Sequence, residues 1–263
     1  MIRPTLHERI NAAREAGRFA RVPFITAGFP DEGGFRRAVL ELDRNGADII
    51  EIGIPFSDPV ADGPVVEDAS RRVLEKGMTL PRTLETLGWM APKLSAALVL
   101  MGYYNPFLQY GLQRLAADAA SIGIQGFIVP DLPLEESGPM RAVLDAHAMD
   151  LIALVGPNTS DARMAEYAAA SRGYVYVVSA LGTTGVRGTL PPAAEQTIAR
   201  ARKAFSIPVA LGFGLSHPGQ VTAMAAQPDA LVFGSSLLRH LDAGGSAAEY
   251  MAVWNQGTPS DPQ

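Results

Sequence analysis

Short runs of apolar, often β-branched residues recur at regular intervals along this chain. Several of them are apolar at consecutive positions, which is the pattern of parallel strands that are covered on both faces. Eight such runs are expected to form strands: Val22–Gly28, Ala47–Ile54, Ala97–Tyr103, Gly126–Asp131, Leu151–Pro157, Tyr174–Ser179, Val209–Gly214 and Ala230–Gly234.

The segments between these runs have the apolar spacing of amphipathic helices. Strand–helix alternation that is carried eight times indicates a parallel sheet. The 263 residues are close to the roughly 250 typical of a barrel. The predicted fold class is therefore α/β, a (β/α)8 TIM barrel with extra helices. Helices are expected at Glu32–Asn45, Val66–Lys76, Gly111–Ile122, Glu135–Ala148 and Pro192–Phe205, with an extra helix at Thr79–Pro92 and another that Ser216 opens as N-cap.

Composition narrows the class of protein further. The net charge of −5 argues against nucleic acid as a partner, because phosphate backbones need a basic face. No apolar run approaches the ~20 residues of a membrane span, and the first 17 residues do not resemble a secretory signal. The absence of cysteine excludes disulfides and thiolate metal sites. We expect a cytoplasmic protein with a single domain over residues 1–263 and a loosely ordered tail from about residue 256; an enzyme and a binding protein both fit.

The second predicted strand, Ile49–Ile54, carries a carboxylate where both faces should be covered. An ionised Glu51 there costs several kcal/mol unless the side chain is paired or its pKa shifts. Glu51 can be a structural residue held by an arginine or by backbone donors. Its place near the carboxyl end of the strand favours catalysis instead, because a buried carboxyl can act alternately as acid and base.

The loop after this strand, residues 55–64, adds two carboxylates to a segment restricted by prolines. Asp62 can simply cap the next helix, and Asp58 before Pro59 can simply form an Asx turn. Because the loop directly follows Glu51 at a strand end, the sequence favours two carboxylates, Glu51 and Asp62, that face one cavity.

Glycines gather at the ends of the last three predicted strands, in SALGTTG (residues 179–185), GFG (212–214) and GSS (234–236). Barrels commonly hold phosphate at this place on backbone N–H groups and a helix N-terminus. Glycine lets the backbone approach the anion, and Ser235 adds a hydroxyl at the start of a short helix that ends near Leu241. Each glycine alone is equally typical of a tight turn; the three together indicate a phosphate site.

Four of these segments also resemble a known family. The run EIGIPFSDPVADGP, residues 51–64, closely resembles the signature of tryptophan synthase α chains. MGYYNP (101–106), VPDLPLEE (129–136) and VPFITAG (22–28) are similar to that family's strand ends. The resemblance runs in order from about residue 5 to about residue 255. It implies a lyase of tryptophan biosynthesis that splits indole-3-glycerol phosphate into indole and glyceraldehyde 3-phosphate by a retro-aldol reaction.

The resemblance also implies roles for individual residues. Glu51 would shuttle protons and Asp62 would bind the indole N–H, while Gly185, Gly214, Gly234 and Ser235 would hold the phosphate. Thr183 departs from the family, which more often has an aliphatic residue there. A lid is expected over residues 183–191, including Thr184 and Arg187. Candidates for the indole pocket, which could equally be core residues, are Phe24, Tyr103, Ile128, Tyr176 and Phe213.

The nearest alternatives are another phosphate-sugar barrel enzyme and a non-catalytic regulatory subunit. Schiff-base chemistry needs a lysine at a strand end, and a metal-dependent epimerase needs clustered ligands. The lysines (Lys76, Lys93, Lys203) lie on or beside helical segments, and the histidines (His7, His147, His217, His240) are scattered, so no metal site is expected.

By resemblance, the chain has a partner, the pyridoxal-phosphate-dependent β chain of tryptophan synthase, in an α2β2 assembly that passes indole through a tunnel. The chain has no evident lysine for pyridoxal phosphate (PLP), so no cofactor is expected on it and PLP is expected only on the β chain. The contact face is expected on exposed proline-bearing loops around Asp58, Tyr104–Pro106 with Asn105, and Pro133, although ordinary barrel-top loops look the same.

Overall fold

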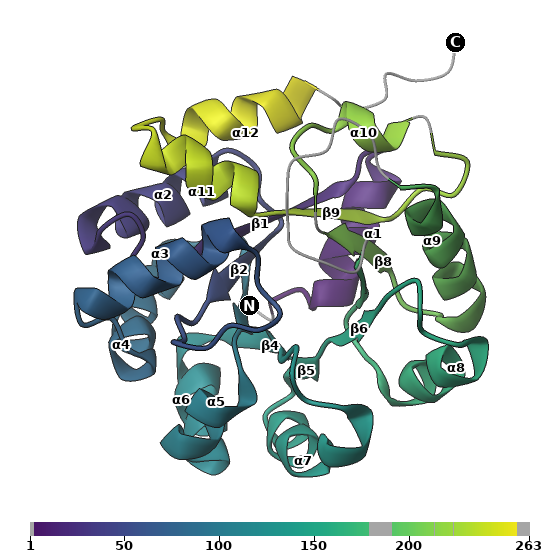
Figure 1. Cartoon of the computed structure of the whole chain (residues 1–263), viewed down its shortest axis with the longest axis horizontal. Coiled ribbons are helices and arrows are strands. Elements are labelled where there is room, and N and C mark those ends of the chain that lie inside the picture. Colours follow the sequence, from purple (N-terminus) through teal and green to yellow (C-terminus); the bar gives the residue numbers. More distant parts are fainter. Residues whose placement is uncertain (1–2, 179–190, 213, 223, 257–263) are drawn as a thin grey trace.

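The computed structural model describes residues 3–178, 191–212, 214–222 and 224–256. Figure 1 shows a ring of helices around a central parallel sheet. The strands are paired in the order β5-β4-β3-β2-β1-β9-β8-β7-β6. They are β1 (Ala20–Thr26), β2 (Ile49–Gly53), β3 (Ala97–Met101), β4 (Ile124–Ile128), β5 (Asp150–Leu151), β6 (Ala153–Val155), β7 (Val175–Val178), β8 (Val209–Gly212) and β9 (Ala230–Phe233).

The two strands at the ends of this order, β5 and β6, are consecutive pieces of one extended segment. Only Ile152 separates them, and its N–H donates to the carbonyl of Phe127 on β4 at 2.9 Å. β5 pairs with β4, and β6 pairs with β7. The segment therefore joins the two edges and closes the barrel. The predicted barrel is confirmed, and the single strand predicted at Leu151–Pro157 is present as these two pieces.

Helices cover the outer face of the strands, which are almost entirely buried. The sides of the helices that face the strands carry apolar residues, and these form one continuous core with the strands. The helices are α1 (Leu6–Glu15), α2 (Glu32–Arg44), α3 (Pro64–Glu75), α4 (Leu80–Met90), α5 (Tyr104–Tyr110), α6 (Leu112–Ile122), α7 (Gly138–Ala146), α8 (Asp161–Ala170), α9 (Pro192–Ala204), α10 (Gly219–Thr222), α11 (Ser235–Asp242) and α12 (Ala247–Gln256), with 3-10 turns η1 (Ala91–Lys93) and η2 (Leu134–Glu136).

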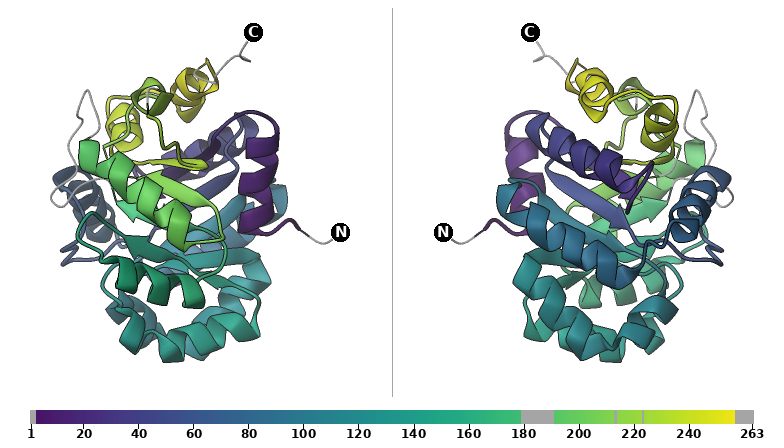
Figure 2. Two further views of the ribbon diagram at one scale, coloured as in Figure 1. Left: turned by 90° about the vertical axis from the view of Figure 1, so that its right-hand side faces the viewer. Right: turned by 90° about the vertical axis from the view of Figure 1, so that its left-hand side faces the viewer.

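Helix α1 lies at the end of the barrel where the strands begin (Figure 2). It begins with a capping box, in which Thr5 and Glu8 satisfy each other's backbone N–H groups. Just after the helix, Arg18 binds Asp48, the residue before β2, through two hydrogen bonds of 2.7 and 2.8 Å. The loops that carry the candidate site lie at the opposite end of the barrel, where the strands end.

Three local expectations differ from the structure. Tyr104–Pro106 was expected in an exposed loop, but it is the first turn of α5. Ser216 is not the N-cap of the helix after β8: α10 begins at Gly219, and the Gln220 side chain accepts the Ser216 N–H instead. Helices α1, α8 and α12 were not predicted. Within the described residues, no helix is long and apolar enough to cross a membrane.

Candidate active site

Glu51 points into the barrel interior. Its Oε1 accepts a hydrogen bond of 2.8 Å from the Tyr174 hydroxyl. Tyr174 directly precedes β7, and β1, β9 and β8 separate β2 from β7 in the sheet. A contact between such distant strands has to cross the middle of the barrel. The carboxyl therefore faces inward, as the sequence predicted, and does not lie beneath a helix.

Burial sets the protonation state of Glu51. The side chain has no solvent exposure. Loss of solvation raises its pKa to about 8, and the hydrogen bond from Tyr174 opposes that rise in part. Its second oxygen, Oε2, has no hydrogen-bond partner among the described residues. At neutral pH the group is mostly a neutral carboxylic acid, which can donate a proton.

Asp62 lies in the loop between β2 and α3, and Tyr103 fixes this loop. The Ala61 N–H donates to the Tyr103 hydroxyl at 2.9 Å. Phe56 stacks on the Tyr103 ring with a centroid distance of 5.2 Å. Burial raises the pKa of Asp62 to about 6, although its hydrogen bond with Tyr103 lowers it. Asp62 is therefore mostly ionised at pH 7, where Glu51 is mostly neutral.

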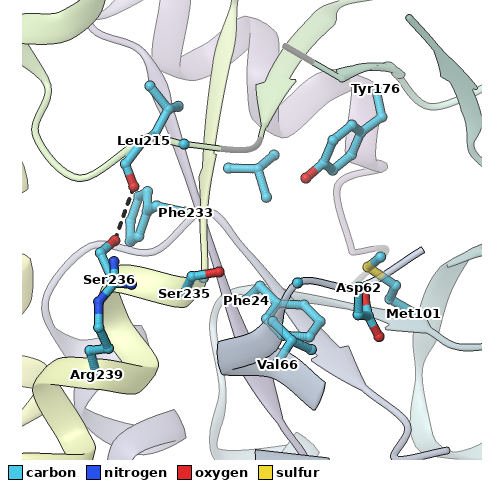
Figure 3. A pocket seen from close by; sticks show the side chains of 14 residues that line it. Phe24, Asp62, Val66, Met101, Tyr176, Leu215, Phe233, Ser235, Ser236 and Arg239 are labelled. Atoms are coloured by element: carbon cyan, nitrogen blue, oxygen red, sulfur yellow. Dashed lines mark hydrogen bonds between the residues drawn. The ribbon is translucent and has the colours of Figure 1, made fainter. Parts of the chain in front are cut away.

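A pocket opens at the carboxyl ends of the strands, and its empty volume of about 570 Å³ includes space that is open to solvent. Figure 3 shows aromatic and apolar side chains around it, with the Ser235 hydroxyl turned toward its centre. An adjoining cavity, lined in part by Tyr103, shares four residues with it, namely Phe24, Asp62, Val66 and Met101. The pocket is lined by Phe24, Asp62, Gly63, Val66, Met101, Tyr176, Gly214, Leu215, Val232, Phe233, Gly234, Ser235, Ser236 and Arg239.

Glu51 lies close to this pocket without lining it. Tyr176, which does line the pocket, lies near both acids. Burial and the charges of Glu51 and Asp62 raise the pKa of Tyr176 well above its usual value. The Phe24 ring packs over Gly53, where an added Cβ would lie 2.4 Å from the ring. Glu51 thus lies near Tyr176, whose side chain lines the same pocket as Asp62.

The predicted phosphate residues Gly214, Gly234 and Ser235 meet at one end of the pocket. Gly214 has a φ of +79°, a left-handed conformation that favours glycine. Gly234 has no room for a side chain, because a Cβ would lie 2.8 Å from the Phe24 ring. Ser235 begins α11, and Ser236 donates to the Leu215 carbonyl at 3.0 Å (Figure 3). The other predicted residues of this region, Thr184, Gly185, Arg187 and Phe213, lie outside the described residues.

The described candidates for the indole pocket fall into two groups. Phe24 and Tyr176 line the main pocket, and Tyr103 lines the adjoining cavity. Ile128 is fully buried at the end of β4 and belongs to neither lining in the described part of the chain. Sequence reasoning missed Arg239, although it follows Ser235 by four residues and thus shares a helix face with it.

The three residues expected at a partner interface are exposed. Asp58, Asn105 and Pro133 follow β2, β3 and β4, which are neighbours in the sheet. Two apolar side chains near them in sequence are also unusually exposed, Val60 at 87% and Leu108 at 49%. No group of three or more His, Asp or Glu side chains that could hold a metal occurs among the described residues.

Barrels of this kind carry out their chemistry at the carboxyl ends of the strands. Here that end offers a neutral acid, an ionised acid and a glycine-built turn region around one apolar pocket. The fold and the pocket therefore define a (β/α)8-barrel enzyme of the acid–base class.

Comparison with known proteins identifies the family. The family model "Tryptophan synthase alpha chain" matches residues 10–258. Tryptophan synthase α chains of Nitratidesulfovibrio vulgaris and Desulfovibrio desulfuricans are each 59% identical, over 95% of this chain and 97% and 98% of theirs. A Mycobacterium tuberculosis tryptophan synthase structure aligns with a TM-score of 0.89 at 32% identity, over 98% of both chains. The α subunit from Legionella pneumophila aligns with a TM-score of 0.85 at 28% identity, over 96% of both.

The chain belongs to the tryptophan synthase α-chain family. It is a carbon–carbon lyase that cleaves indole-3-glycerol phosphate in tryptophan biosynthesis.

Proposed function

We propose that Glu51 moves the protons of this retro-aldol reaction. The neutral carboxylic acid protonates C3 of the indole ring and leaves an indolenine cation. The resulting carboxylate then takes the proton from the adjacent glycerol hydroxyl. The C–C bond breaks, its electron pair returns to the ring, and indole and glyceraldehyde 3-phosphate are formed. To reach C3, Glu51 exchanges its hydrogen bond with Tyr174 for contact with the substrate.

Asp62 accepts a hydrogen bond from the indole N–H in this proposal. The ring becomes positive after protonation at C3, so the bond to an ionised carboxylate strengthens as the transition state forms. Gly214, Gly234 and Ser235, with Gly185, hold the phosphate at the other end of the pocket. The two ends together fix the scissile bond between the acids and the phosphate site.

One observation carries the proposal: a fully buried, mostly neutral Glu51 lies next to a pocket that an ionised Asp62 enters. Environments that push two carboxyl pKa values apart are typical of acid–base pairs with divided roles.

The test is indole release by the isolated chain. Glu51→Gln should lower kcat by about 10²- to 10⁴-fold, the usual value of a positioned proton transfer. Asp62→Asn should lower it by about 10²- to 10³-fold. Asp58→Asn in the same loop and Glu75→Gln on the exposed side of α3 are matched controls and should keep wild-type turnover. Normal kcat in either of the first two variants would remove that residue from the mechanism.

We further propose that the chain acts in the cytoplasm and binds a tryptophan synthase β chain in an α2β2 assembly, and that PLP is held by that partner. Exposure of Asp58, Asn105 and Pro133 on adjacent loops supports a contact face there. Measuring indole formation with and without the β chain tests the partnership; an unchanged rate together with no detectable association would contradict it.

A further inference from the structure

One cation lines the pocket and has no role in the reaction as described. Arg239 is the only positively charged side chain among the described residues that line it. It lies on α11 four residues after Ser235, so the two share one face of the helix. Side chains on a helix lean toward its N-terminus, and in Figure 3 the Arg239 side chain runs back toward Ser236. Its side chain therefore lies beside Ser236, at the edge of the pocket that Ser235 also lines.

Arg239 is also free to bind something else. No ion pair or hydrogen bond ties its side chain to another group in the part of the chain that the structure describes. The nearby Asp242, on the same helix, pairs instead with Arg72 at 2.7 Å. The side chain is exposed, so it can reach a ligand from the solvent side without first losing a partner.

We propose that Arg239 binds the substrate phosphate and completes the backbone cradle formed around Gly214, Gly234 and Ser235. This inference rests on the proposed function only in placing the phosphate at this end of the pocket. Arg239 supplies the positive charge that neutral backbone N–H groups lack.

Charge explains why the site needs a cation. A phosphate monoester carries about −1.5 to −2 charges at pH 7. Asp62, mostly ionised, lines the same pocket. A guanidinium offsets part of this negative charge and presents two parallel N–H donors, which match phosphate oxygens. Arg239 should therefore strengthen the binding of ligands with a dianionic group and leave the binding of neutral indole compounds almost unchanged.

The test separates the two halves of the substrate. Binding of glycerol 3-phosphate and of indole is measured by calorimetry for the wild type, Arg239→Gln and Arg239→Lys. Arg114→Gln is the control, because Arg114 is an arginine on the surface of α6 with 69% exposure. Arg239→Gln should weaken glycerol 3-phosphate binding by about 3- to 10-fold, as expected for a partly exposed charged contact. Indole binding should change by less than about twofold.

Two further readouts identify the cause. Arg239→Lys should recover part of the loss, since it keeps the charge but not the forked donors. The loss in Arg239→Gln should shrink in about 0.5 M salt, because exposed charges are screened. Unchanged glycerol 3-phosphate binding, or equal weakening of both ligands, would overturn the proposal. Failure of the catalytic proposal would appear separately, as normal kcat for indole release in Glu51→Gln or Asp62→Asn.

Discussion

At the scale of single residues, the two acids predict a bell-shaped pH dependence. Asp62 must be ionised and Glu51 protonated at the start of the reaction, and their pKa values are about 6 and about 8. kcat/KM for indole release should therefore rise through pH 6, peak near pH 7 and fall through pH 8. The substrate phosphate also titrates near pH 6, so the alkaline side is the diagnostic one.

Tyr174→Phe provides the control for this profile. Its hydroxyl lowers the pKa of Glu51, so removal should move the alkaline side of the profile to higher pH. An alkaline side that does not move in this variant would show that another group is titrating.

The same buried carboxyl makes protein stability depend on pH. Folding raises the pKa of Glu51 from 4.5 to about 8, so the folded state binds this proton more tightly. The contribution is complete below pH 4.5 and is lost as pH rises through 8. The glutamine in Glu51→Gln does not titrate. Between pH 5 and pH 9 the free energy of unfolding of this variant should therefore rise relative to that of the wild type by a few kcal/mol (~1.4 per pKa unit).

Urea unfolding at the two pH values measures this gain, with Glu75→Gln as the control for charge removal. A constant difference between Glu51→Gln and the wild type across this range would contradict burial of the carboxyl as the cause of its raised pKa.

At the scale of elements, the capping box of α1 predicts a loss of stability without a loss of function. The Thr5 side chain accepts the Glu8 N–H, and the helix buries Leu6, Ile10 and Ala13. Thr5→Ala should lower the free energy of unfolding by about 0.5–2 kcal/mol. Turnover of the folded variant should stay at the wild-type level, because α1 lies at the opposite end of the barrel from the pocket. A wild-type free energy of unfolding in urea would contradict the role of the cap in stability, and a changed kcat would contradict its independence from the active site.

The elements that the sequence predicted best are those whose pattern is local. Apolar runs located the strands, and the Thr79–Pro92 pattern located α4, which Thr79 caps. The division of one strand into β5 and β6 at Ile152 depends on how the barrel closes, and no local pattern encodes closure. Helix α5 was missed because Asn105 and Pro106, typical loop residues, lie in its first turn, where proline is tolerated.

The same distinction applies to the site. Glu51 could be predicted because a carboxylate in a buried strand is unusual in itself. Asp62 could be predicted because its loop directly follows Glu51 and because the run that contains both resembles the family's signature. The bond from Tyr174 to Glu51 could not, since it joins strands on opposite sides of the barrel. Arg239 could have been found from its spacing to Ser235, but a surface arginine on a helix is ordinary until the pocket is seen.

At the scale of the whole molecule, one side of the barrel is suited to a partner. The loops after β2, β3 and β4 lie side by side because these strands are neighbours. The loop after β2 presents Asp58 and the exposed apolar side chain of Val60, and helix α5, which follows β3, presents Asn105 and the exposed side chain of Leu108. Apolar side chains that solvent reaches so freely gain most when another surface covers them.

Leu108 makes this face testable. It lies on α5 with 49% exposure and does not line the pocket, so a charge there should disturb association and leave the isolated enzyme intact. Leu108→Glu should weaken binding to the β chain at least about tenfold, or ~1.4 kcal/mol, because a buried unpaired carboxylate opposes docking. Indole release by the isolated chain should not change.

Val253, 41% exposed on α12, provides the matched control: Val253→Glu adds the same charge to another face and should leave the affinity unaltered. If both variants bind the β chain as tightly as the wild type in sedimentation or calorimetry, the partner docks elsewhere. If both weaken it equally, net charge decides the affinity rather than this face. Only a loss confined to Leu108→Glu places the partner on the side of the barrel where the loop that carries Asp62 also lies.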